Sequence, residues 1–279
     1  MRVCALDIEW HEEVKGAAAD QARPGEPVLF LHGFSQDMRT WLPVVERFPT
    51  DITSVLVDLP GHGQSDKPRD VAPYRIGRLV EGLEVLRAEL GHERWHVVGY
   101  SMGGRIALAY ATHHPRRVAS LVLESASFGP RDAEARNRAL RADDVLVERL
   151  RHSSAREFAE WWAQTPVLAD QAGLPEGSRA LEAEMRVAND PQALASVVLG
   201  AGQGQMADLF GAAGTLPMPL MYVVGNRDSK YSAIAQEAHD AWGLDVRTLP
   251  TGHNVHLEQP QEYAALLLRF FRHEDEERR

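Results

Sequence analysis

Short apolar runs alternate with longer segments of helical periodicity along the first half of the chain. The runs predict strands at VCALDIEW (3–10), VLFLHG (28–33), SVLVDLP (54–60), WHVVGY (95–100) and RVASLVLES (117–125). Helical periodicity covers 74–90 and 102–114. Val- and Leu-rich strands that alternate with helices form a parallel sheet covered on both faces. The pattern therefore predicts an α/β fold.

The pattern changes between residues 128 and 216. Four segments in this region have helical periodicity and none is a convincing strand: 132–150, 154–164, 178–188 and 191–200. Strand and loop signals then return in PLMYVVGNRD and DVRTLP. We expect a core formed by 1–127 and 217–279, with 128–216 as a helical cap inserted before the last strands. Such a cap would lie over the carboxyl ends of the strands, where α/β proteins bind ligands.

Composition restricts the partners more than the fold. The chain has 279 residues and a formal net charge of -10, which disfavours nucleic acid and anionic membranes because both attract basic surfaces. A small anionic substrate stays compatible, since it responds to the local charge of a pocket. Cys4 is the only cysteine, so no intramolecular disulfide can form, which fits a reducing compartment.

The opening segment carries Asp7 and Glu9 where a signal peptide needs an apolar core. No apolar run approaches the roughly 18 residues of a membrane span. We therefore expect a cytoplasmic protein without a membrane partner. The sequence gives no prediction of the oligomeric state.

The stretch GYSMGGR (99–105) places Ser101 between glycines, after a predicted strand and before a predicted helix. In this context G-x-S-x-G predicts a sharp strand-to-helix turn that exposes the serine hydroxyl as a nucleophile. The alternative is a serine that only caps the helix. We favour the nucleophile because the flanking glycines meet the steric requirement of such a turn.

A serine nucleophile needs a base that is oriented by an acid. Asp228 follows the predicted strand of YVVGNRD, and His253 lies in the later loop TGHNVH. This gives the chain order serine, acid, histidine that one class of α/β enzymes uses. We expect Ser101, Asp228 and His253 to form a catalytic triad, with His256 and His239 as weaker candidates for the base.

The loop LHGFS (31–35) follows another predicted strand. In this class of enzymes one backbone N–H from such a loop and one from the residue after the nucleophile stabilise an oxyanion. Here those donors would belong to Phe34 and Met102. The prediction depends on position and not on side-chain type.

Arg105 stands four residues after Ser101, so both lie on one face of the predicted helix. A cation in the first turn opposes the helix dipole at a cost of about 0.3–1 kcal/mol, whereas a bound carboxylate at this end would be favourable. The alternative is an arginine that extends to water. We favour substrate binding, and hence a small substrate that carries a carboxylate.

These motifs resemble the α/β-hydrolase superfamily. The segments GYSMGGRIALAYA, LVLESASFG, EFAEWWAQTPVL, MRVAND, GNRDSKY and GHNVHLEQP are similar, more closely, to the 2-succinyl-6-hydroxy-2,4-cyclohexadiene-1-carboxylate synthase family of menaquinone biosynthesis. The resemblance extends from about Val28 to Phe271. It implies an α/β-hydrolase fold and no metal or organic cofactor.

The resemblance also implies a reaction, the elimination of pyruvate from 2-succinyl-5-enolpyruvyl-6-hydroxy-3-cyclohexene-1-carboxylate. The serine acts there as the base that removes a ring proton. By the same resemblance Arg105 and Arg186 bind substrate carboxylates, while Trp161 and Tyr100 line the pocket. Trp161 aligns better with the family's pocket tryptophan than its neighbour Trp162 does.

Two departures from the family pattern concern the cap. Asp144 stands where some members have a further arginine, for which Arg138 or Arg141 could substitute, and GAGQGQ replaces a motif that often begins with arginine. An alternative function is a serine hydrolase acting on carbon–carbon bonds of anionic ring-cleavage products, or a carboxylesterase or lactonase. A binding module without catalysis is disfavoured, because all three triad residues are present.

Overall fold

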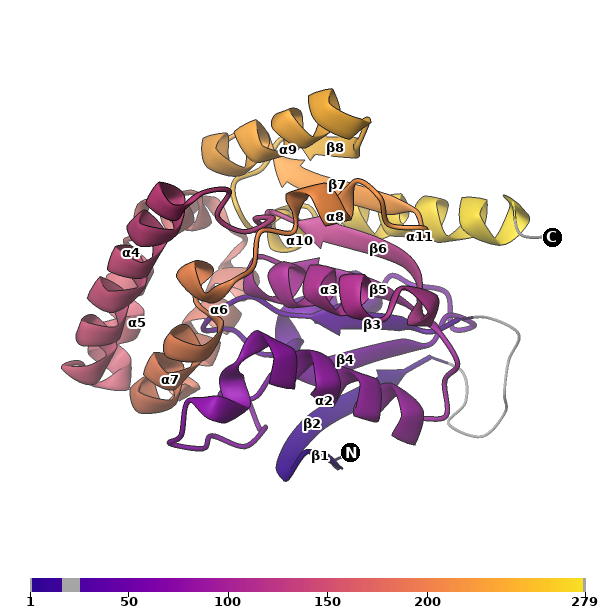
Figure 1. Ribbon diagram of the computed structural model, residues 1–279. Helices are drawn as coiled ribbons and strands as arrows, with labels where there is room; N and C mark the ends of the chain where they lie inside the picture. Colours follow the sequence, from indigo (N-terminus) through magenta and orange to yellow (C-terminus); the bar gives the residue numbers. More distant parts are fainter. Residues whose placement is uncertain (1, 17–25, 278–279) are drawn as a thin grey trace.

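The computed structural model describes residues 2–16 and 26–277. Eight strands form one sheet in the order β1-β2-β4-β3-β5-β6-β7-β8 (Figure 1). The β1–β2 and β2–β4 pairs are antiparallel and the other pairs are parallel. The strands are β1 (Arg2–Ala5), β2 (Ile8–Lys15), β3 (Val28–Leu31), β4 (Ser54–Asp58), β5 (Trp95–Tyr100), β6 (Val118–Glu124), β7 (Leu220–Gly225) and β8 (Asp245–Leu249).

Eleven α-helices occur in the described part of the chain, with short 3-10 turns between them. The α-helices are α1 (Leu42–Val45), α2 (Ile76–Glu89), α3 (Met102–His113), α4 (Ala133–Arg151), α5 (Ala155–Trp162), α6 (Glu176–Ala188), α7 (Pro191–Ala201), α8 (Phe210–Ala213), α9 (Ser229–Trp242), α10 (Val255–Glu258) and α11 (Pro260–Glu277). The 3-10 turns are η1 (Met38–Trp41), η2 (Ala72–Tyr74), η3 (Pro115–Arg117), η4 (Pro166–Gly173) and η5 (Gln203–Gln205).

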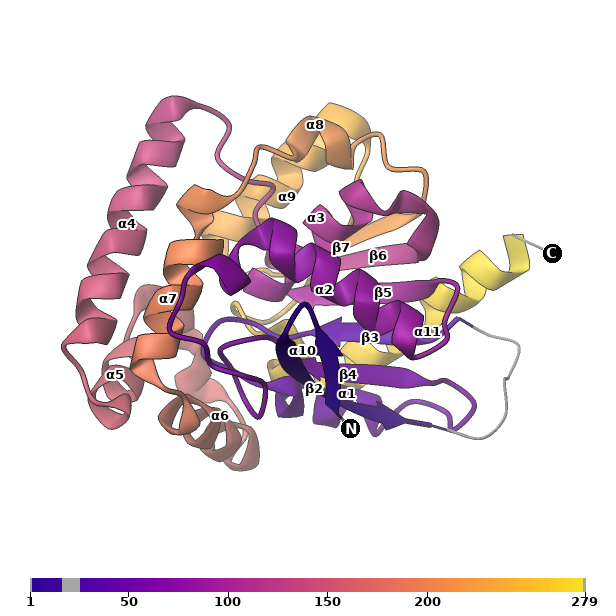
Figure 2. The same ribbon diagram turned by 60° about the horizontal axis from the view of Figure 1, so that its bottom comes forward.

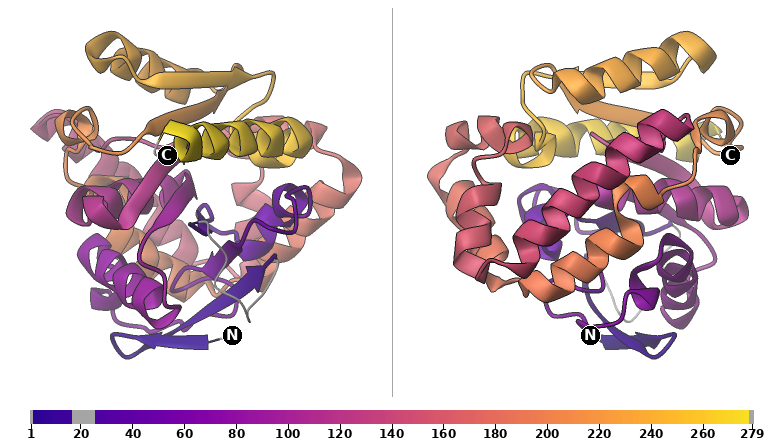
Figure 3. Two further views of the ribbon diagram at one scale, coloured as in Figure 1. Left: turned by 90° about the vertical axis from the view of Figure 1, so that its right-hand side faces the viewer. Right: turned by 60° about the vertical axis from the view of Figure 1, so that its left-hand side comes forward.

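The two faces of the sheet carry separate hydrophobic cores. Alternate residues of β3 show the division, since Leu29 and Leu31 belong to one core and Val28 and Phe30 to the other. Helices α2, α3 and α9 cover the first face, and α1, α10 and α11 cover the second (Figures 1 and 3). Burial on both faces explains why the central strands read as continuous apolar runs.

One sequence expectation at the start of the chain is wrong. Residues 3–10 were expected as one strand, but Leu6 and Asp7 have positive φ angles of 57° and 65° and divide the segment into β1 and β2. Two consecutive residues with positive φ form the tight turn of a β-hairpin. Asp tolerates this conformation, whereas Leu rarely adopts it, so the pattern gave no signal for the turn.

The chain between β6 and β7 is helical, and no strand occurs among its described residues. Helices α4–α7 lie together at one end of the sheet (Figures 1 and 2). They have a small core of their own that includes Leu150, Phe158 and Leu194. Nowhere in residues 2–16 and 26–277 does a helix combine the length and apolarity needed to cross a bilayer.

Close packing of α3 on the sheet generates the first prediction. A Cβ atom at Gly103 would lie 2.3 Å from the carbonyl oxygen of Leu31 and 2.6 Å from that of His32. Both are backbone atoms that cannot move aside alone. We expect Gly103→Ala to lower the free energy of unfolding by roughly 2 kcal/mol or more, measured from urea unfolding midpoints.

Gly77 on α2 provides the matched control, because a Cβ atom there would meet nothing within 4 Å. Gly77→Ala should raise the free energy of unfolding by roughly 0.5–1 kcal/mol through helix propensity. Equal midpoints for the two variants would contradict the assignment of this close contact.

Candidate active site

Ser101 lies at the turn between β5 and α3 in a strained conformation, with φ 50° and ψ -105°. Its backbone N–H donates to the carbonyl of Glu124, the last residue of β6, at 2.8 Å. A non-glycine residue at positive φ persists only where its surroundings hold it. The turn therefore presents the hydroxyl group at the amino end of α3, beyond the carboxyl end of the sheet.

Asp228 and His253 come from the two following strand ends. Asp228 follows β7 and is the N-cap of α9, while His253 lies in the loop between β8 and α10. His253 Nδ1 is 2.6 Å from Asp228 Oδ2, and His253 Nε2 is 3.2 Å from Ser101 Oγ. Both side chains are nearly buried. This order of contacts can move the serine proton to the imidazole while the carboxylate orients the ring.

The two weaker histidine candidates lie elsewhere. His256 is fully buried, with Nδ1 2.8 Å from the carboxylate of Glu124 and Nε2 2.8 Å from the hydroxyl of Thr40. His239 lies near the end of α9 and contacts the carbonyl of Leu244. Neither contacts Ser101, so His253 alone of the three has the position of a base.

The two residues expected to supply backbone N–H donors lie in the same region. Phe34 and Met102 both line the cavity that contains Ser101. Neither N–H group has a hydrogen-bond acceptor among the described residues. The Met102 N–H has none because the first N–H groups of a helix lack an intrahelical partner. Such a pair of free donors can stabilise a developing oxyanion.

Two buried imidazoles hold the loop that carries Phe34. His62 Nε2 accepts from the N–H of Ser35 at 3.2 Å, and His32 Nε2 accepts from the N–H of Leu59 at 3.0 Å. Both rings are fully buried, and burial lowers the pKa of both histidines. They remain neutral and act as hydrogen-bond acceptors at fixed positions, which makes their role structural.

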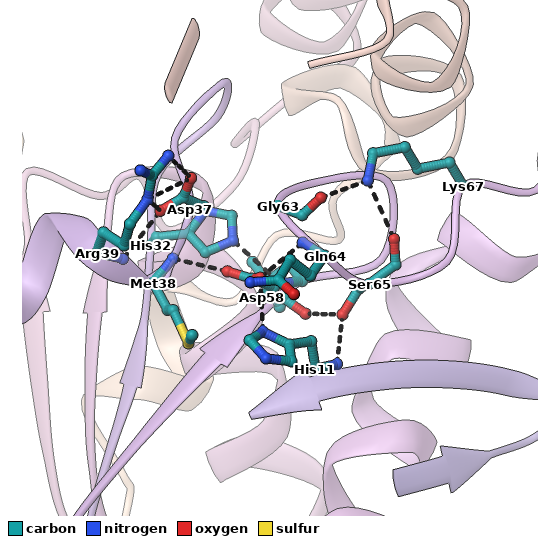
Figure 4. Close-up of polar contacts among 11 residues, drawn as sticks. His11, His32, Asp37, Met38, Arg39, Asp58, Gly63, Gln64, Ser65 and Lys67 are labelled. Carbon is teal, nitrogen blue, oxygen red and sulfur yellow. Dashed lines mark hydrogen bonds and ion pairs between the residues drawn. The ribbon is translucent and has the colours of Figure 1, made fainter. Parts of the chain in front are cut away.

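Asp58 connects the same loop to the segment after β4 (Figure 4). Its carboxylate accepts from the N–H groups of Met38 and Gln64, both at 2.8 Å. It also lies 3.1 Å from His11 Nδ1. These contacts join η1, which follows the loop that carries Phe34, to the segment after β4.

A cavity of about 300 Å³ opens at the triad. Its walls come from the carboxyl end of β5, the loops after β3 and β8, the helices α3, α4–α7 and α9, and the adjoining turns. The charged side chains in its wall are Arg105, Asp143, Glu182, Arg186 and Lys230. Some of these charged side chains form ion pairs within the protein and others do not, and this difference determines what the cavity can bind.

Arg105 is buried, with 8% of its surface exposed, which excludes the alternative that it extends to water. One guanidinium nitrogen donates to the carbonyl of Ala201 at 2.7 Å. No carboxylate among the described residues forms an ion pair with it, and the one carboxylate whose charge acts on it is that of Asp143. Burial lowers the pKa of Arg105, but arginine stays charged under ordinary conditions. A buried cation that lacks an ion pair thus lines the same cavity as the hydroxyl of the candidate nucleophile.

Arg186 has a different environment. Its guanidinium lies 2.5 Å from the carboxylate of Glu182 and also contacts the amide oxygen of Gln171. Glu182 accepts a further hydrogen bond from Gln36 at 2.7 Å. Burial raises the pKa of Glu182. Arg186 thus lines the cavity already paired with a carboxylate of its own helix.

The structure corrects the choice between the two tryptophans. Trp162 lines the cavity and meets the ring of Phe34 edge-on at 5.4 Å. Trp161 does not line it and lies instead beneath the guanidinium of Arg149, at 5.3 Å. Adjacent helical residues diverge by about 100°, so only one can face the cavity. Tyr100 lines the cavity as expected from its position before Ser101.

Neither proposed substitute for the missing cap arginine reaches the cavity. Arg138 pairs with Glu134 on the surface of α4, and Arg141 is exposed. Asp143 is the charged residue that α4 presents to the cavity, not Asp144. Burial raises the pKa of Asp143, which accepts a hydrogen bond from the N–H of Gly204 at 2.8 Å.

Sequence reasoning missed several groups in the cavity wall. Asp143, Gln36, Gln171 and Glu182 line it without having been singled out. Only Glu182 left a signal, since an acidic residue four positions before Arg186 on one helix predicts an ion pair. The others depend on how α4 and the loops are placed against the sheet.

The fold and the site define an enzyme of the α/β-hydrolase class. A family model described as alpha/beta hydrolase fold matches residues 26–260. The chain therefore belongs to this family.

Individual relatives are more specific. A protein of Salmonella newport (strain SL254) named 2-succinyl-6-hydroxy-2,4-cyclohexadiene-1-carboxylate synthase is 34% identical, over 86% of this chain and 93% of that protein. A relative from Bacillus subtilis (strain 168) is 30% identical over 95% of this chain and 97% of its own length. Among solved structures, MenH from S. aureus superposes with a TM-score of 0.87 at 26% identity, covering 95% of this chain and 99% of the other.

The triad geometry predicts selective labelling by a fluorophosphonate probe. The wild-type protein should be labelled at Ser101, and Ser101→Ala should abolish labelling. His253→Ala should slow it by about 10²-fold or more, since a general base contributes about 10²–10⁴-fold. Labelling is followed over time by mass spectrometry.

His239→Ala serves as the control for loss of a histidine, because His239 lies outside the site. Its labelling rate should equal that of the wild type. Labelling of Ser101→Ala at an undiminished rate would show that another residue is the reactive nucleophile.

Proposed function

We propose that this enzyme eliminates pyruvate from 2-succinyl-5-enolpyruvyl-6-hydroxy-3-cyclohexene-1-carboxylate to give 2-succinyl-6-hydroxy-2,4-cyclohexadiene-1-carboxylate. The observation that carries the proposal is the buried guanidinium of Arg105, which faces the cavity beside Ser101 without a carboxylate partner. A neutral ester offers it no counter-charge, whereas this substrate carries three carboxylates. The names of the relatives support the same reaction.

In the proposed mechanism Ser101 is the base. His253 takes the hydroxyl proton through Nε2, and Asp228 holds the ring in the required orientation at Nδ1. The serine oxygen then removes a proton from the ring carbon of the substrate. The electron pair shifts through the conjugated system, the ring carbon–oxygen bond breaks, and enolpyruvate leaves. The methylene carbon of enolpyruvate takes up the proton that His253 releases, which gives pyruvate and returns His253 to its neutral form, so that atoms and charge balance.

Arg105 would bind a substrate carboxylate and fix the ring next to Ser101. The N–H groups of Phe34 and Met102 would stabilise negative charge that develops on the succinyl ketone oxygen as the proton leaves. Both effects act by positioning and by preorganised electrostatics. No step requires a metal ion or an organic cofactor. The single cysteine fits a reducing compartment, so we assign the reaction to the cytoplasm as part of this proposal.

A second candidate is hydrolysis of an ester, a lactone or a carbon–carbon bond in an anionic ring-cleavage product. The free N–H groups of Phe34 and Met102 favour it, because acyl transfer requires an oxyanion hole. Arg105 separates neutral from anionic substrates but does not separate the two anionic classes. Direct assay distinguishes them.

Pyruvate release is the decisive measurement. The substrate is generated in situ by the enzyme that makes it, and pyruvate is followed through a coupled dehydrogenase. The wild type should release pyruvate far above the uncatalysed rate, and Ser101→Ala should abolish the acceleration. Arg105→Ala should reduce kcat/KM by about 10²-fold or more, which corresponds to about 2.7 kcal/mol.

Arg138→Ala is the control for loss of an arginine, because Arg138 pairs with Glu134 outside the cavity. Its kcat/KM should match that of the wild type. If pyruvate never exceeds the uncatalysed rate while simple esters are cleaved, the second candidate replaces the first.

The two tryptophans give a matched test of the cavity wall. Trp162→Leu should raise KM by about tenfold with little change in kcat, because it removes apolar contact that substrate and transition state share. Trp161→Leu should leave KM within about twofold, since Trp161 packs beneath Arg149. Both KM values are measured by steady-state kinetics of pyruvate release. A larger rise in KM for Trp161→Leu than for Trp162→Leu would contradict the structure.

A further inference from the structure

The charged groups of the cavity wall form two separate clusters. Arg105, Lys230 and Asp143 gather around 201–204, where they contact Ala201, Gln203 and Gly204 respectively. Arg186 and Glu182 lie on α6, where Gln36 and Gln171 complete their hydrogen bonds. The two clusters differ in charge balance, which bears on what each can bind.

The first cluster has an excess of positive charge. Two cations face one carboxylate, and no ion pair joins Arg105 or Lys230 to a described acidic residue. Asp143 accepts from the N–H of Gly204 and its charge also acts on Arg105, which leaves one positive charge of the cluster in excess. A substrate carboxylate placed here would supply the missing counter-charge.

The second cluster is balanced within the protein. Glu182 is 1% exposed and Arg186 is 5% exposed, and their closest approach is 2.5 Å. The Nε of Arg186 is buried without a hydrogen-bond partner among the described residues. A second carboxylate brought to this position would meet Glu182 at close range, in surroundings where water screens little.

We propose that Glu182 determines the charge selectivity of this cavity. By holding Arg186 in a buried ion pair, it makes the α6 cluster a subsite for an uncharged hydrogen-bonding group such as a hydroxyl or a ketone. Carboxylates are then bound at the Arg105 and Lys230 cluster. The assignment rests on the proposed function in treating this cavity as the substrate site. It narrows the substrate class to molecules with carboxylate at one side and neutral oxygen at the other.

The test compares two probes that differ only in one charge. The linear dicarboxylates from succinate to pimelate and their monoamides are titrated by calorimetry, at low ionic strength and at a pH where carboxylates are ionised. In the wild type each monoamide should bind as tightly as its dicarboxylate or more tightly, because the second carboxylate would meet the charge of Glu182. In Glu182→Gln the best-fitting dicarboxylate should bind about tenfold tighter than its monoamide or more, because Arg186 is then free to bind the second carboxylate.

Glu184→Gln is the matched control. It removes the same charge from the same helix, at a side chain that is 66% exposed and pairs with Arg39 outside the cavity. It should bind both probes as the wild type does. A double variant, Glu182→Gln with Arg186→Met, should lose the gained preference, which separates release of Arg186 from a general change in the cavity.

Three outcomes would overturn the proposal. These are a wild-type preference of tenfold or more for the dicarboxylate, an equal effect of Glu182→Gln on both probes, and no binding of either probe at millimolar concentration. The first needs no variant to fold. The titration is also independent of catalysis. If the binding pattern is as expected but the enzyme releases no pyruvate, only the proposed reaction is rejected. If the enzyme releases pyruvate but the wild type prefers the dicarboxylate, only the assignment of Glu182 is rejected.

Discussion

Close approach of α3 to the backbone of the central strands governs the geometry of this site. A Cβ atom at Gly99 would lie 2.6 Å from the carbonyl oxygen of Gly103, and one at Gly103 would lie 2.3 Å from that of Leu31. Because no side chain separates helix and sheet, the chain must turn within one residue. That residue is Ser101, which adopts a positive φ. The same turn leaves the N–H of Met102 without a partner, so one packing constraint yields both the exposed hydroxyl and a free donor.

Around this turn the protein avoids uncompensated buried charge almost everywhere. His32 and His62 are held neutral, and the buried carboxylate of Glu124 is paired with His256. A buried charge without an ion pair is costly. Arg105 has none, although the charge of Asp143 acts on it, and this distinguishes the cavity from its surroundings. The other buried charged or titratable groups near this turn are neutral or paired. We therefore expect a ligand to supply the carboxylate that pairs with Arg105.

The sequence predicts those features that depend on local order along the chain. Alternation of apolar strands with helices specifies the α/β fold, and strand-end positions identify Ser101, Asp228 and His253 as residues that meet at one edge of the sheet. The hairpin turn at Leu6 and Asp7 was missed because Leu gives no sign of a positive φ.

The side chains of the helical segment are harder to predict, because their direction depends on the rotation of each helix about its axis. A rotation of about 100° separates Trp161 from Trp162, and periodicity alone did not determine which one faces the cavity. The same uncertainty led to Arg138 and Arg141 as substitutes where α4 in fact presents Asp143. These positions follow from tertiary packing of α4–α7 against the sheet, which local patterns do not encode.

Arg105 on α3 contacts the end of α7, and this contact explains the orientation of its guanidinium. It lies in the first turn of α3, where the helix dipole disfavours a cation, and it donates to Ala201, the last residue of α7, where the dipole favours one. The two effects are each about 0.3–1 kcal/mol and largely cancel. Protein contacts thus fix the direction of the guanidinium without neutralising it. A bound carboxylate would add a charge-assisted hydrogen bond of about 1.5–3 kcal/mol, and most of the net electrostatic stabilisation at this position would then come from the ligand.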